Sequence, residues 1–263
     1  MRIIGQVESL WRYPVKSMRG EEVQEAFVGF AGVYGDRLFA FRSSASPAGF
    51  PYLTGREHAE LLRYRPRFRH PSKAVTPPNL TAAERITPGL NPVFAAPADL
   101  AVDIETPWGA VLAVEDPTLI RMLGERIGAG HDLTLVRSER AMTDCRPISL
   151  FSVQTGQQLG EEIGSALDKR RFRANIYMTL DEAVGFVEDT FIGRTLRIGA
   201  KTTIVILERD PRCKMVTLDP ETGEATPEIL EKVMQDHHGM AGVYGAVLAE
   251  GTVRPGDAIA WLP

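Results

Sequence analysis

Short apolar stretches, many of them rich in β-branched residues, recur along the chain between Gly, Pro, Asn and Asp turn signals. Stretches of this length and composition are typical of strands rather than helices. Because most of the joining loops are short, we expect mainly antiparallel pairing. The predicted strands include Ile3–Leu10, Leu38–Arg42, Leu100–Glu105, Val111–Val114, Leu133–Arg137, Ile148–Phe151, Ala174–Met178, Thr202–Leu207, Val243–Leu248 and Ala258–Leu262.

Three segments carry the end signals of short helices. Asp and Ser before the first turn can accept hydrogen bonds from free N–H groups, Pro fits the first turn, and Gly suits the residue after the last turn. The predicted helices run from the Asp116-Pro117 cap to Gly128, from the Ser152 cap to Gly164, and from Thr226-Pro227 to Met234.

The stretch from Pro71 to Pro97 has no periodicity and is rich in Pro, Ser, Thr and Asn, which predicts an insertion or a linker. A hairpin follows it and turns at Thr106-Pro107-Trp108-Gly109. We place the domain boundary just after this hairpin, which gives a domain of residues 1–115 and a domain of residues 116–263.

The composition is that of a globular protein, with 263 residues of which 44% are hydrophobic and 24% are charged. The net charge of -4 gives no overall basic field that would collect nucleic acid or an anionic membrane, so any anion site must be local. No apolar run has the length of a signal peptide or a membrane span, and we therefore expect a cytoplasmic protein. The zincin, P-loop, Rossmann and hydrolase-elbow motifs are all missing.

Arginines alternate with Tyr, Pro and Phe from Arg63 to Arg69. In an extended segment the four cations would share one face. Such a stripe could bind RNA or single-stranded DNA. The competing interpretation is a strand edge guarded by charge and proline, and the negative net charge favours it.

Cys213 is the most informative single residue. It follows a buried-type strand and lies between Arg212 and Lys214, and cationic neighbours favour a thiolate, which is a nucleophile and a ligand for soft metals. The alternative is a small core cysteine flanked by exposed charges, and local composition does not separate the two. The other cysteine, Cys145, is interpreted as a packing residue.

The segments around Cys213 resemble the MOSC family, the proteins similar to the C-terminal domain of molybdenum cofactor sulfurase. Further matching segments occur in the family's order along nearly the whole chain. The resemblance implies an α+β, predominantly β fold with two β-barrel-like domains and a few short peripheral helices. The matching segments are Trp11-Arg-Tyr-Pro-Val-Lys-Ser-Met-Arg-Gly20, Tyr34-Gly35-Asp36-Arg37, Leu53-Thr54-Gly55-Arg56, Arg171-Phe-Arg-Ala-Asn-Ile176, Arg212-Cys213, Leu218-Asp-Pro-Glu-Thr-Gly223, Gly242-Val-Tyr244 and Gly251-Thr-Val-Arg-Pro-Gly-Asp257.

The functional relatives that the resemblance implies are amidoxime-reducing proteins, which hold a mononuclear molybdenum on a molybdopterin and reduce N-hydroxylated compounds. By this resemblance Cys213 is the metal ligand and Asp144 a proton relay. The implied cofactor-binding residues, which supply cations and neutral hydrogen-bonding groups for the phosphate and the pterin edge, are Lys16, Ser17, Arg37, Arg173, Asn175, Arg212, Cys213 and Tyr244.

The chain departs from the family pattern at Met18, Phe39, Ser149 and Ala174. Because no ferredoxin-like extension follows Pro263, we expect electrons to come from a separate ferredoxin or flavoprotein. The alternative function is a molybdenum cofactor carrier or a sulfur-transfer protein that uses a Cys213 persulfide. A third candidate is an RNA-binding module built on the Arg63–Arg69 stripe.

Overall fold

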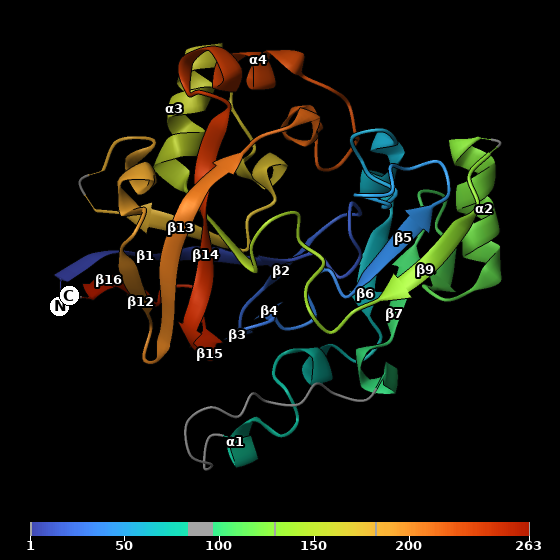
Figure 1. Cartoon of the computed structure of the whole chain (residues 1–263), viewed down its shortest axis with the longest axis horizontal. Coiled ribbons are helices and arrows are strands. Elements are labelled where there is room, and N and C mark those ends of the chain that lie inside the picture. Colours follow the sequence, from blue (N-terminus) through green and yellow to red (C-terminus); the bar gives the residue numbers. More distant parts are fainter. Residues whose placement is uncertain (1, 84–96, 129, 182, 263) are drawn as a thin grey trace.

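The computed structural model describes residues 2–83, 97–128, 130–181 and 183–262. Strands dominate, and the helices are few and short, which confirms the predicted α+β, predominantly β class. Figure 1 shows a group of long strands with α3 and α4 at one end, and beside it a second group of shorter strands with α2. No helix in the described part of the chain combines the length and the apolar character needed to cross a membrane.

Seven strands close into a barrel. Six of the seven strand pairs are antiparallel, while β10 and β11 pair in parallel because α3 (Val153–Ile163) crosses between them. β2 (Glu21–Val23) extends the sheet outside the closed ring. The order around the barrel is β1 (Arg2–Arg12), β11 (Ile176–Leu180), β10 (Ile148–Ser152), β14 (Met240–Ala249), β13 (Thr202–Pro211), β12 (Thr195–Ile198) and β16 (Ala258–Leu262).

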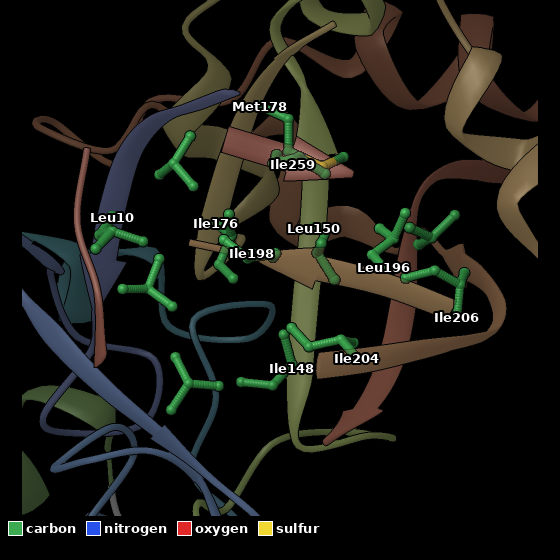
Figure 2. Close-up of a cluster of buried hydrophobic side chains, with 14 of the residues drawn as sticks. Leu10, Ile148, Leu150, Ile176, Met178, Leu196, Ile198, Ile204, Ile206 and Ile259 are labelled. Atoms are coloured by element: carbon green, nitrogen blue, oxygen red, sulfur yellow. The ribbon is translucent and has the colours of Figure 1, made fainter. Parts of the chain in front are cut away.

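The barrel interior is filled by aliphatic side chains that alternate with outward-facing residues along the strands. Figure 2 shows these side chains, from Leu10 on β1 to Ile259 on β16, converging between the strands. Burial of this interior is the main stabilising contribution to the barrel, at about 25 cal/mol for each Å² of apolar surface removed from water.

The remaining strands form three small sheets. A second core of aromatic and aliphatic residues lies among them and includes Leu119 and Leu123 of α2 (Pro117–Ile127). No ladder joins these sheets into a second closed ring among the described residues. The sheets are β15 (Gly251–Val253), β3 (Ala26–Gly29) and β4 (Gly32–Val33); β5 (Phe39–Ser43) and β9 (Leu133–Arg137); and β6 (Arg65–Phe68), β7 (Val102–Glu105) and β8 (Val111–Ala113).

All ten of the named strand predictions are confirmed, and the strands that the pattern missed have two to four residues each. The predicted caps of two helices are confirmed as well: Asp116 accepts a hydrogen bond from the Thr118 N–H at 2.7 Å, and Ser152 Oγ accepts one from the Thr155 N–H at 3.1 Å. α4 (Pro227–Asp236) ends two residues later than predicted, and Thr226 makes no side-chain capping bond.

The predicted linker between Pro71 and Pro97 contains short helical turns. They are η2 (Pro71–Ala74), the four-residue α1 (Leu80–Ala83) and the start of η3 (Pro97–Leu100). Residues 84–96 of that prediction lie outside the described residues. The other 3-10 helices are η1 (Ala59–Arg63), η4 (Lys169–Phe172), η5 (Val187–Phe191) and η6 (Lys214–Thr217).

β6 carries the middle of the arginine stripe and lies at the edge of its sheet. Arg65 and Arg67 point to solvent while Pro66 and Phe68 are buried, so the cations do share one face. They face acidic residues of the neighbouring strand: both lie within 4 Å of Glu105, and Arg69 pairs with Asp103. This is the geometry of the charged-edge interpretation.

The two halves of the chain exchange strands. β1 closes the barrel of the C-terminal half, while β15 pairs with β3 and β9 pairs with β5. The boundary between residues 115 and 116 stays a prediction, and the exchange makes independent folding of either part a question for experiment.

Candidate functional site

Loops from both halves of the chain meet around one cavity, which encloses about 740 Å³ counted out to its open mouth. The segment after β1, the approach to β5, the loop before β10, η4 and the junction of β13 with η6 all contribute to it. The lining residues are Lys16, Ser17, Arg37, Phe50, Thr54, Arg56, Thr143, Asp144, Ser149, Arg171, Phe172, Arg173, Asp210, Pro211, Arg212, Cys213, Met215, Val216 and Tyr244.

The lining is strongly cationic although the chain as a whole carries a net charge of -4. Six Lys and Arg side chains face the cavity against two carboxylates, Asp144 and Asp210. Converging cations that exceed the nearby carboxylates attract an anion. The cavity therefore provides a local cationic surface that the net charge of the chain does not reveal.

Three lining residues adopt left-handed backbone conformations: Ser17 with φ 66°, Arg37 with φ 45° and Arg173 with φ 53°. The described residues contain only five such non-glycine positions. Left-handed φ angles disfavour L-residues, and strained residues of this kind concentrate at functional sites. The three motifs that supply these residues thus each turn sharply at the cavity.

Arg37 and Arg173 lie against the same buried aromatic ring, with their guanidinium carbons 4.5 Å and 4.2 Å from the centre of Tyr13. Arg37 donates to Asp36 at 2.5 Å, and this carboxylate outweighs the effect of burial and raises the pKa of Arg37. Arg173 donates to the Met18 carbonyl at 2.8 Å, and burial together with Arg37 lowers its pKa to about 10. An anion bound between the guanidinium groups of Arg37 and Arg173 would favour the charged form of Arg173 and raise its pKa.

Lys16 is buried, and its ammonium donates to the Met142 carbonyl at 2.8 Å and pairs with Asp144. Burial lowers the pKa of Lys16, and Asp144 opposes that effect. Asp144 lies at the mouth with 48% of its side chain exposed. Partial burial would raise the pKa of this carboxyl, but Lys16 outweighs it and the pKa is lowered. Asp144 is therefore ionised at neutral pH.

Cys213 follows the end of β13 and occupies the residue before η6, half-buried in the cavity wall. The side chain of Arg212 next to it is anchored by the carbonyls of Ala241 at 2.6 Å and Phe172 at 2.9 Å. Its Nη2 lies near Gly242, where a Cβ atom would be only 3.1 Å away. The absence of a side chain at Gly242 leaves the space that Arg212 occupies.

Asp210 is the second lining carboxylate, and only 3% of the residue is exposed. Its Oδ2 lies 2.8 Å from Arg212 Nη2, and the nearby Tyr244 hydroxyl favours its ionised form and so opposes the rise of its pKa. Burial nevertheless raises the pKa of Asp210 to about 6. Burial and Asp210 also raise the pKa of Tyr244, which keeps its proton.

The mouth of the cavity continues into a groove that shares Arg212, Cys213 and Tyr244 with it. In the groove wall Tyr52 joins Phe50 of the cavity, with ring centres 5.3 Å apart, and Pro47 and Glu57 lie beside them. Cys145 also lines the groove and is exposed, so its interpretation as a packing residue was wrong. The guanidinium of Arg56 lies 4.9 Å from the centre of the Phe50 ring. A small molecule in the groove would therefore reach Cys213 past an aromatic surface.

Eight of the nine residues chosen from the sequence line the cavity, and Asn175 does not. Its buried amide donates to the Trp11 carbonyl at 3.3 Å, while its Oδ1 accepts from the N–H and the hydroxyl of Ser149. Asn175 thus joins β1 to the strand that carries Ser149. The eight lining residues are Lys16, Ser17, Arg37, Asp144, Arg173, Arg212, Cys213 and Tyr244.

Sequence reasoning missed three charged residues of the wall: Arg56, Arg171 and Asp210. Arg56 and Arg171 stood inside matching segments, so segment membership was a signal for both. Arg171 holds the Cys213 loop through the Thr217 carbonyl at 2.6 Å. The only signal at Asp210 was its place at the end of an apolar strand, next to Pro211 and three residues before Cys213.

Two family models match the sequence: the MOSC N-terminal beta barrel domain over residues 4–90 and the MOSC domain over residues 137–260. No curated protein gives a significant match. Among solved structures, the YuaD protein of Bacillus subtilis is 11% identical, with 98% of this chain and 96% of that chain covered and a TM-score of 0.48.

Two further solved structures are the YiiM proteins of Geobacillus stearothermophilus and Escherichia coli, which are 17% and 11% identical to this chain. Each comparison covers 45% of this chain and 55% of the YiiM chain, with TM-scores of 0.36 and 0.34.

Proposed function

This chain belongs to the MOSC family, whose members bind the molybdenum cofactor, and from that premise we propose that it reduces N-hydroxylated compounds at a molybdopterin held in the cationic cavity. The electrons would come from a separate protein, a ferredoxin or a flavoprotein. The observation that carries the proposal is the meeting of six cations and one thiol, Cys213, in a single cavity that opens to solvent.

The residues present suit a molybdopterin. Its phosphate is an anion, and the cavity has an excess of cations, among them Arg173 with a pKa lowered by burial and by Arg37. Arg212 Nη2 is buried and makes no hydrogen bond within the described residues beyond its ion-pair contact with Asp210. Cys213 is the type of soft ligand that molybdenum accepts from a protein.

The roles of the side chains follow from their positions. Arg37 and Arg173 would bind the phosphate, since a guanidinium can donate two parallel hydrogen bonds to its oxygens. Lys16 and Ser17 would complete the polar wall, and Cys213 would hold the metal at the mouth.

The aromatic wall of Phe50 and Tyr52 would hold the substrate in the groove, because planar substrates stack on aromatic rings. When bound, the cofactor supplies the redox centre that takes up two electrons and passes them to the substrate.

The test is to produce the wild type, Cys213→Ser and Cys145→Ser in a host that makes abundant molybdenum cofactor. Metal is measured by mass spectrometry, and pterin by fluorescence after oxidation. We expect near-stoichiometric molybdenum and pterin in the wild type and in Cys145→Ser, and loss of molybdenum in Cys213→Ser. The Cys145 variant is the matched control, because this cysteine lies on the groove outside the proposed ligand set. A folded wild type without pterin would refute the proposal.

A cofactor carrier or a persulfide-based sulfur-transfer protein is the second candidate, and the observation that favours it is the half-exposed position of Cys213 on an open groove. Turnover separates the two. A reductase keeps its metal and converts benzamidoxime with reduced viologen, whereas a carrier releases its pterin to an apo-enzyme and shows no turnover.

A further inference from the structure

Asp210 lies opposite an irregularity in the sheet and lines the cavity. On β13 Arg209 pairs with Val243 and Pro211 pairs with Met240, with a register shift between the two pairs. The shift places two β14 residues, Ala241 and Gly242, opposite the single β13 residue Asp210, so the bulge belongs to β14. Bulges interrupt the ladder and are frequent beside active sites. Asp210 stands at the shift, almost fully buried, with its carboxyl on the cavity.

The groups that face this carboxyl come from several segments. Arg212 pairs with it, the Tyr244 hydroxyl on β14 lies near it in the same cavity and favours its ionised form, and the charges of Asp144 and Arg37 act from farther away. Burial dominates the balance, which leaves a pKa of about 6. A carboxyl in this range is still partly protonated near neutral pH, and it is acidic enough to release its proton.

The two carboxylates of the cavity are therefore not equivalent. Asp144 is half exposed and is held ionised by Lys16, so it carries no proton to give at neutral pH. Asp210 is shielded, and its neutral form is favoured by burial. When two environments shift the pKa values of two carboxyl groups in opposite directions, one group can act as a proton donor while the other stays ionised.

We infer that Asp210 is the proton donor of this cavity and that the Tyr244 hydroxyl returns protons to it from solvent. Asp210 lines the inner cavity, whereas Tyr244 lines both the cavity and the open groove and so bridges the buried carboxyl to water. The inference rests on the reductase function proposed above, since that reaction consumes protons.

The reaction balances as R–NH–OH + 2 e⁻ + 2 H⁺ → R–NH₂ + H₂O. The N–O bond breaks, the nitrogen is reduced, and the hydroxyl oxygen leaves as water. The two electrons come from the external protein donor. Asp210 gives one proton to the departing oxygen, its carboxylate is stabilised by Arg212, and a proton from solvent returns through Tyr244. The second proton comes from solvent in the groove and goes to the nitrogen.

The experiment compares the cofactor-loaded wild type, Asp210→Asn, Tyr244→Phe and Glu188→Gln, with reduced viologen as donor and benzamidoxime as substrate. In the wild type we expect kcat to fall about tenfold per pH unit above an apparent pKa near 6. Asp210→Asn should lower kcat by roughly 10²- to 10⁴-fold and remove this pH dependence. Tyr244→Phe should keep the carboxyl and slow turnover, with a larger solvent isotope effect.

Glu188 is the matched control, because it is also a fully buried carboxylate whose pKa is raised by burial, and it lies away from the cavity among Ser152 and Thr155. Glu188→Gln should leave the pH profile of kcat unchanged. The readout independent of turnover is the infrared band of a protonated carboxyl in the cofactor-free protein. This band should titrate near pH 6, vanish in Asp210→Asn and persist in Glu188→Gln.

An unchanged pH profile in a loaded, active Asp210→Asn variant would overturn the inference. So would the absence of the titrating carboxyl band from the wild type. If the loaded wild type turns over no N-hydroxylated substrate while the band titrates as expected, the proposed reductase function fails and the assignment of the carboxyl stands.

Discussion

Side chains at the cavity owe their directions to unusual local backbone conformations. Ser17, Arg37 and Arg173 have positive φ angles, and a bulge on β14 interrupts the ladder opposite Asp210. Each irregularity costs free energy, of order 1–3 kcal/mol for a strained residue, and persists because the surrounding core holds it. Tyr13 illustrates this support, because its buried ring packs against both Arg37 and Arg173.

At the residue scale we predict that Asp210 makes stability depend on pH. Its folded pKa of about 6 exceeds the ordinary value of 3.8, so the folded state binds the proton more tightly than the unfolded state. The contribution of Asp210 to the free energy of unfolding is fully present below pH 3.8 and is lost as the pH rises through about 6. The loss amounts to roughly 3 kcal/mol.

Asp210→Asn removes this effect. Relative to wild type, the cofactor-free variant should therefore gain up to about 3 kcal/mol in free energy of unfolding between pH 4 and pH 7. Urea unfolding at several pH values measures the difference between the two proteins. A difference that stays constant across the range would show that the carboxyl is not perturbed.

At the scale of elements, the ends of helices and loops are secured by side chains close in sequence. Asp219 accepts hydrogen bonds from the Glu221 and Thr222 N–H groups at 2.8 Å and 2.9 Å, which shapes the turn that ends at Gly223. Glu221 in that turn pairs with Arg19 and Arg170, one from each half of the chain. Through these two ion pairs the Leu218–Gly223 motif holds the segment that follows Cys213 against both halves of the chain.

The two caps of α3 and α4 provide a matched pair for mutation. Ser152 Oγ caps the Thr155 N–H and also donates to the buried carboxylate of Glu188 at 2.8 Å, so Ser152→Ala should destabilise the protein by about 1–3 kcal/mol. Thr226 makes no side-chain capping bond, and Thr226→Ala should cost less than about 0.5 kcal/mol. Urea unfolding of the two variants tests the contrast, and equal losses would contradict it.

At the scale of the whole molecule, the cavity exists only where the two halves of the chain meet. Lys16, Arg37 and Arg56 come from the N-terminal half, and Arg173, Asp210 and Cys213 come from the C-terminal half. The exchange of β1, β9 and β15 locks these halves together. The site is therefore a product of the complete chain and not of either matched domain alone.

We predict that residues 116–263 do not fold alone. Without β1 the barrel is open between β11 and β16, which exposes two strand edges and the apolar interior. The fragment should aggregate or unfold without cooperativity in circular dichroism, and co-expression with residues 1–115 should rescue it. A monomeric fragment with a cooperative transition would instead support a self-sufficient domain at that boundary.

Signals local in the sequence determined where most of the longer strands lie and where two of the helices begin. Alternation and turn residues located the long strands, and the Asp116 and Ser152 caps marked helix starts, because these signals act within a few residues. Seven of the eight predicted residues that line the cavity lie in the segments that resemble the family, and Asp144 lies outside those segments. The strands that escaped have two to four residues each, and so short a stretch has little periodicity to detect. β7 and β8 are equally short, but the hairpin turn between them marked both.

Only the tertiary structure decided that β1 closes the barrel and that Asn175 joins β1 to β10 instead of lining the cavity. It also decided that Asp210 lines the cavity. These facts depend on contacts between residues far apart in the chain. The charge state of Asp210 has the same origin, because the pKa of a carboxyl is set by its burial and by the groups that the fold brings near it, such as Arg212 and Tyr244.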